Sequence, residues 1–89
     1  MQIRIAERRR SPRSPAHGSV KLVFRDPFNI VVLGELVDTN EGGFRLSHDN
    51  QRLTAGVEVH YSFRSKSGRA RVVWTHVLEG RRVSGLVYI

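Results

Sequence analysis

The chain has 89 residues, no cysteine, 8% aromatic residues and a formal net charge of +7 at pH 7. This length corresponds to one small domain and excludes large multi-substrate enzymes, while the lack of cysteine excludes disulfide frameworks, thiolate catalysis and cysteine-based zinc sites. No apolar run approaches the roughly 18 residues of a membrane span, and no secretory signal is evident, so we expect a cytoplasmic protein without membrane insertion.

Residues 1–18 are predicted to form a flexible, arginine-rich N-terminal arm. They hold five of the thirteen arginines and one acid, which gives +4, whereas the other 71 residues contribute the remaining +3. Pro12, Pro15 and Gly18 interrupt any regular pattern in this segment. Because guanidinium groups suit two-pronged recognition of phosphate, we expect the arm to meet an anionic partner.

Residues 19–89 are predicted to form an all-β body, because apolar and polar residues alternate with period two. Helix is expected at most as a short turn, in the arm or near 50–53. Short, regularly spaced strands suggest a sandwich or a small closed barrel, and closure is favoured because it removes unpaired edges. The six predicted strands are 20–25, 30–37, 44–46, 57–63, 69–75 and 83–89.

Turn-forming residues separate these strands at 26–29, 38–43, 65–68 and 79–80. Trp74 alternates with Ala70 and Val72, which favours a place in the core at one end of the barrel; stacking on a nucleotide base is the alternative. Four further aromatic residues are predicted to lie in the core: Phe24, Phe44, Tyr61 and Phe63.

The arm carries the first cluster of candidate binding residues. Arg9 and Arg13 stand four apart, and Arg8 and Arg10 flank the first of them. Each guanidinium can form paired hydrogen bonds to phosphate or to the O6 and N7 of guanine, and charge-assisted bonds of this kind contribute roughly 1.5–3 kcal/mol. The alternative is a solvated basic tail that only improves solubility.

The turn after the second predicted strand carries the other cluster, Asp38, Asn40 and Gly43. A carboxylate here can accept hydrogen bonds from N1–H and N2–H₂ of guanine, an amide can donate or accept, and glycine allows a close approach. The alternative is an ordinary hairpin turn, since such turns are rich in Asp, Asn and Gly.

Together the two clusters resemble the PilZ domain family, whose signature is RxxxR in an N-terminal arm followed by (D/N)xSxxG in a β-turn. The first motif is present as Arg9-Arg10-Ser11-Pro12-Arg13, and the second as Asp38-Thr39-Asn40-Glu41-Gly42-Gly43. Residues 69–74 and 83–88 are similar to the family's fifth and sixth strands. The resemblance covers the chain from Glu7 to Ile89, with one departure, since Asn40 stands where the family has serine.

This resemblance implies a six-stranded antiparallel barrel that binds the bacterial second messenger cyclic di-GMP, as a monomer or a stacked dimer. It implies that Arg9 and Arg13 contact phosphates and guanine edges, with Arg8 and Arg10 as helpers. Asp38 would accept from a guanine, and Gly43 would keep the geometry of the turn. Ordering of the arm would then alter a surface offered to a protein partner.

Two alternatives stay open: a PilZ-like scaffold that binds protein without nucleotide, and a small basic barrel that binds nucleic acid. The second lacks the exposed aromatic pair of single-strand binders, so we do not expect nucleic acid as the ligand. We expect neither catalysis nor a cofactor, because no nucleophile turn is visible. We also expect no metal site, since no two of the four histidines, His17, His48, His60 and His76, are three to five residues apart and each has a polar or strand-surface setting.

Overall fold

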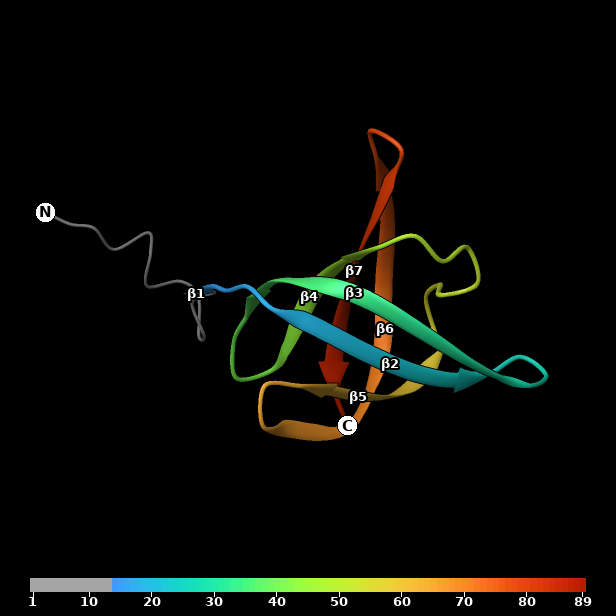
Figure 1. The fold of residues 1–89 in the computed structure, drawn as a ribbon, viewed down its shortest axis with the longest axis horizontal. Coiled ribbons are helices and arrows are strands. Elements are labelled where there is room, and N and C mark those ends of the chain that lie inside the picture. Colours follow the sequence, from blue (N-terminus) through green and yellow to red (C-terminus); the bar gives the residue numbers. More distant parts are fainter. Residues whose placement is uncertain (1–13) are drawn as a thin grey trace, which may run out of the picture.

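The computed structural model describes residues 14–89, which form a closed antiparallel β-barrel with no helix in that range (Figure 1). The strands are β1 (Ser14–Pro15), β2 (Ser19–Arg25), β3 (Asn29–Thr39), β4 (Gly43–His48), β5 (Glu58–Phe63), β6 (Lys66–Leu78) and β7 (Arg81–Tyr88). Their order is β1-β3-β2-β5-β6-β7-β4, and an additional pairing of β3 with β4 closes a barrel of the six longer strands. The all-β, six-stranded prediction is therefore confirmed. None of the described residues belongs to a helix able to cross a membrane.

The period-two pattern places one side of each strand in a single core. In β2, Val20 and Leu22 are fully buried while Lys21 and Arg25 are exposed. The apolar side chains on one face of the strand are removed from contact with water, and this burial is the main force that holds a small barrel closed. The buried apolar residues are Val20, Leu22, Phe24, Val32, Leu36, Phe44, Leu46, Leu53, Val59, Phe63, Ala70, Val72 and Leu86.

An aromatic cluster around Phe44 fills the end of the barrel nearest the β3–β4 turn. The ring centroid of Phe44 lies 5.3 Å from Tyr61, 5.0 Å from Phe63 and 5.8 Å from Tyr88, in tilted or edge-on arrangements. Such geometry adds a favourable electrostatic term to the burial of the rings. The predicted core placement of Phe24, Phe44, Tyr61 and Phe63 is confirmed, with Tyr61 packed against the buried cluster.

The loop 49–57 closes the opposite end. Leu53 is fully buried, and the backbone N–H of Gly56 donates to the carbonyl of Val72 at 2.8 Å. The Arg52 Nη1 donates to the carbonyl of Asp26 at 2.9 Å, which ties the loop to the β2–β3 turn. Where the sequence allowed a short helix near 50–53, the structure has only a turn.

The two longest hairpins, β2–β3 and β6–β7, extend beyond the barrel in different directions (Figure 1). The β6–β7 turn lies at Glu79 and Gly80 as predicted, with both residues at positive φ. The β5–β6 turn differs from the prediction. It occupies Arg64 and Ser65 rather than 65–68, because β6 already pairs with β5 from Lys66 onward.

A β-bulge between Val72 and Trp74 corrects the predicted core placement of Trp74. Val72 pairs with Leu86, whereas Trp74 pairs with the adjacent residue Gly85, so one residue of β6 is unmatched. An extra residue reverses the alternation of a strand. Ala70 and Val72 consequently face the core, while Trp74 lies half-buried on the outer face of the barrel.

Candidate functional site

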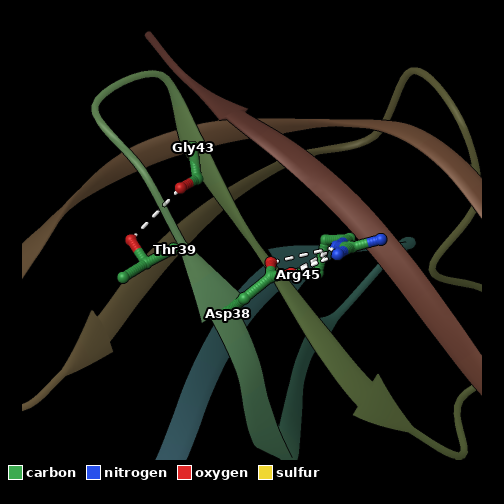
Figure 2. A network of polar contacts seen from close by, with 4 residues as sticks. All are labelled: Asp38, Thr39, Gly43 and Arg45. Atoms are coloured by element: carbon green, nitrogen blue, oxygen red, sulfur yellow. Dashed lines mark hydrogen bonds and ion pairs between the residues drawn. The ribbon is translucent and has the colours of Figure 1, made fainter. Parts of the chain in front are cut away.

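The turn between β3 and β4 is built by the side chain of Asn40. Its Oδ1 accepts hydrogen bonds from the backbone N–H groups of Gly42 at 2.8 Å and Gly43 at 3.0 Å. The Asn40 N–H donates to the Gly43 carbonyl at 3.0 Å, and Thr39 Oγ1 donates to the same oxygen at 3.2 Å (Figure 2). An Asn that folds its side chain onto its own turn in this way is a common device of tight turns. The amide oxygen of Asn40 therefore stabilises the turn.

Gly43 is required by the close approach of β7. A Cβ built at this residue would lie 1.9 Å from the carbonyl oxygen of Leu86, a distance that no side chain can occupy. Gly43 pairs with Val87, and the Tyr88 N–H donates to the Gly42 carbonyl at 2.9 Å. The sequence motif thus contains a glycine that the barrel itself needs, independently of any ligand.

Asp38 is held by Arg45, a residue that the sequence interpretation missed. A bulge after Leu36 brings Asp38 opposite Arg45 on β4, where Asp38 is 6% exposed. The Arg45 Nε lies 2.9 Å from Asp38 Oδ1 and 3.0 Å from Oδ2, and the Arg45 Nη2 forms an ion pair with Oδ2 (Figure 2). The hydrogen bonds that Arg45 donates to the Asp38 carboxylate raise the pKa of Arg45 above its ordinary value. Asp38 and Arg45 are seven residues apart across the β3–β4 turn, and this spacing could have suggested that they pair. The position of the bulge in β3 is needed to make that prediction.

Asp38 and Arg45 begin a row of outward-facing residues that crosses four strands. Arg45 pairs with Gly85 on β7, and Gly85 pairs with Trp74 on β6. A Cβ at Gly85 would lie 2.5 Å from Trp74 Cε2, so the indole lies directly over the glycine. Since neighbouring strands are about 4.8 Å apart, the row spans about 14 Å. We call Asp38, Arg45, Gly85 and Trp74 the outer row.

His76 extends the ring surface at the β6 end of the outer row. The centroids of Trp74 and His76 are 4.7 Å apart, with 31° between the ring planes. Both residues are on β6 and two positions apart, so they share the outer face of the strand. The row therefore combines a carboxylate, a guanidinium and aromatic rings.

β1 brings the end of the arm beside this site. Ser14 pairs with Thr39 and Pro15 pairs with Asp38, and the Ala16 N–H donates to the Val37 carbonyl at 3.1 Å. The two sequence motifs are separated by about 25 residues, yet the residue that follows the first motif pairs with a residue of the second. The four predicted arginines, Arg8, Arg9, Arg10 and Arg13, lie outside the described residues.

Lys66 adds a cation on the far side of the β3–β4 turn, and the sequence interpretation did not identify it either. Its Nζ lies 5.1 Å from the ring centroid of Tyr88 and 5.7 Å from that of Phe63. The Tyr88 hydroxyl in turn lies 3.4 Å from Thr39 Oγ1, so this cation–π contact adjoins the turn. Lys66 is the first residue of β6, and only the closure of the barrel brings it here.

His48, predicted to have a polar or strand-surface setting, is instead buried in the interior with only 1% of its surface exposed. Its Nδ1 accepts a hydrogen bond from the Asn50 N–H at 3.0 Å, so the proton resides on Nε2, which lies 2.7 Å from Ser84 Oγ. Ser84 bonds Thr75 Oγ1 at 2.6 Å, and Thr75 donates to the Leu53 carbonyl at 3.0 Å. Burial, and then the charge of Arg82, lower the pKa of His48.

This buried chain of hydrogen bonds is structural. A nucleophilic serine needs a histidine nitrogen that can accept its proton, whereas the Nε2 of His48 is the donor. Ser84 is also fully buried and offers no approach for a substrate. Within residues 14–89 no group of three or more His, Cys, Asp or Glu residues is arranged to hold a metal ion.

Neither the known protein-family models nor the curated protein sequences match this chain.

Proposed function

We propose that this chain is a non-enzymatic receptor of the PilZ type, which binds cyclic di-GMP on the outer row. One observation carries the proposal. The antiparallel pairing of Ser14 and Pro15 with Thr39 and Asp38 brings the residue that follows RxxxR beside the DxNxxG turn. Two halves of a binding motif that are distant in sequence need such a junction to act on one ligand.

Arg45 and Asp38 supply complementary hydrogen-bonding groups. The contacts of Arg45 with Asp38 engage Nε and Nη2, so Nη1 is the nitrogen that would face a phosphate. Asp38 would accept from a guanine edge beside the guanidinium of Arg45, to which it is already bound. Arg9 and Arg13 would close over the ligand from the arm.

Trp74 supplies a ring surface at the other end of the outer row. Its indole is held over Gly85 on the outer face of the barrel, where a purine can stack on it. Stacking of a base on an aromatic side chain contributes roughly 1–3 kcal/mol. Closing of the arm on the bound nucleotide would then change the surface that the barrel offers to a protein partner.

Calorimetric titration of cyclic di-GMP into the full chain tests this function. The wild-type chain is expected to give saturable binding, and Arg13→Gln is expected to abolish most of it. Arg64→Gln, at the exposed β5–β6 turn, is the matched control and should bind as the wild type does. Absence of binding in both the wild type and Asn40→Ser would refute the receptor function.

A scaffold without nucleotide is the second candidate, and one observation favours it. Asn40 stands at the serine position of the motif, and its amide oxygen is occupied by the backbone of its own turn. Binding of cyclic di-GMP by Asn40→Ser but not by the wild type would support this scaffold and indicate that the site was lost at residue 40.

A further inference from the structure

The outward face of the β2–β3 hairpin carries large apolar side chains that the core does not use. Leu33 is 71% exposed, Val31 is 56% exposed, and Phe28 in the turn is 81% exposed. The inward residues of the same strands, among them Leu22 and Val32, are buried and complete the core. Exposed apolar groups that gather in one region mark an interaction surface more often than scattered ones do.

The register of the hairpin makes these side chains contiguous and surrounds them with cations. Val31 pairs with Val23, Leu33 pairs with Lys21, and Asn29 pairs with Arg25, so all of these share the outer face. The apolar strip therefore has Lys21 beside one end and Arg25 beside the other. We call Lys21, Val23, Arg25, Phe28, Val31 and Leu33 the hairpin surface.

Two acids border this surface, and cations outnumber them. Asp26 belongs to the β2–β3 turn, and the guanidinium of Arg52 donates to the backbone carbonyl of the same residue at 2.9 Å. Glu35 lies farther along β3, away from the tip of the hairpin. Arg25 and Arg52 together exceed the charge of Asp26, so the tip remains cationic, and Lys21 offsets Glu35. A partner must therefore supply negative charge and an apolar environment at the same place.

We propose that the hairpin surface docks this protein on an anionic lipid bilayer, with Phe28 entering the headgroup region. A nucleic acid supplies negative charge but little that would bury Val31 and Leu33. A bilayer interface supplies anionic headgroups for Lys21 and Arg25 and acyl chains for the apolar strip, and it requires no matching cavity. The hairpin projects from the barrel, so its tip can reach a flat surface (Figure 1). This docking is independent of cyclic di-GMP binding.

The test uses a tryptophan as a reporter of the environment at position 28. The chain has one tryptophan, so Phe28→Trp in a Trp74→Phe background gives a single indole. Its emission is expected to shift to shorter wavelength with vesicles of phosphatidylglycerol and phosphatidylcholine, and to stay unchanged with phosphatidylcholine alone. Val77→Trp in the same background is the matched control, because Val77 is 62% exposed on the other projecting hairpin and should not shift.

Vesicle sedimentation of the full chain separates the hairpin from the arginine-rich arm. Leu33→Ser is expected to weaken binding at least tenfold, and Lys21→Gln and Arg25→Gln roughly fivefold each. Replacement of all five arm arginines by Gln, at positions 4, 8, 9, 10 and 13, should leave the emission shift of the Phe28→Trp reporter in place.

Three results would overturn the proposal. Binding of vesicles without a shift at position 28 would assign the contact to another part of the chain. An equal shift with neutral vesicles would remove the role of the cations. A shift of the same size with a single-stranded oligonucleotide would identify the surface as a nucleic-acid site.

Discussion

The buried hydrogen-bond chain through Ser84 makes the sharpest prediction about stability. Ser84 is fully buried and lies 2.7 Å from His48 Nε2 and 2.6 Å from Thr75 Oγ1. Ser84→Ala removes both contacts while it changes the volume of the side chain very little. Thr75 keeps the Leu53 carbonyl as an acceptor, but the Nε2–H of His48 loses its acceptor in a place that water does not reach.

The cost follows from these two losses. A hydrogen bond contributes about 0.5–1.5 kcal/mol net, and a buried donor left without a partner costs about 1–3 kcal/mol. We therefore expect Ser84→Ala to lower the free energy of unfolding by about 2–3 kcal/mol. For a domain of this size, that corresponds to a fall in Tm of roughly 10–20 °C.

Urea unfolding followed by circular dichroism measures this difference. Ser62→Ala is the matched control, because Ser62 lies exposed on β5, and it should change stability by less than about 0.5 kcal/mol. The reasoning is refuted if Ser84→Ala unfolds with the same midpoint as the control, since the His48 proton would then have another acceptor.

Three further predictions concern charge and packing. The pKa of His48 is lowered in the folded state, so the unfolded chain binds a proton at this residue more readily. The free energy of unfolding should therefore stay constant above about pH 6.5 and fall below it, by up to about 1.4 kcal/mol per pH unit. Urea titrations across that pH range measure this change. Gly85→Ala should displace the Trp74 indole, shift its fluorescence emission and destabilise the barrel by about 1–3 kcal/mol. Arg45→Gln should lower the free energy of unfolding by about 1–3 kcal/mol, because it removes the charged partner of the buried Asp38 carboxylate, and it should weaken cyclic di-GMP binding if Arg45 faces a phosphate.

Matched variants separate these effects from general damage. His48→Gln should flatten the loss of stability below pH 6.5, whereas His60→Gln, on the exposed face of β5, should leave that slope unchanged. Gly42→Ala is the steric control for Gly85→Ala, since its nearest atom would lie at an ordinary contact distance of 3.6 Å. An unshifted emission in Gly85→Ala would contradict the placement of the indole.

The amino-acid sequence by itself determined the class of the fold and most of its strands. The alternation of Val20, Leu22 and Phe24 with charged residues required an extended segment with one buried face, and the structure has β2 there. The Glu79–Gly80 turn was likewise predictable, because it depends on residue types next to each other in the chain. These features are local, so a local pattern can specify them.

The candidate site was predictable only in part. Asp38, Asn40 and Gly43 stood out because they occupy one short turn. Arg45 and Lys66 did not, because cross-strand register and barrel closure bring them to that turn.

Only the tertiary structure determined the features that depend on how strands pair with and cover one another. The bulge at Val73 turned Trp74 from the core to the outer face, and closure of the barrel enclosed His48 against Ser84. A period-two pattern carries no information about where a partner strand skips a residue or which distant strand covers a face. Those outcomes depend on the packing of the whole barrel, because only in the packed barrel is one strand register more stable than the alternatives.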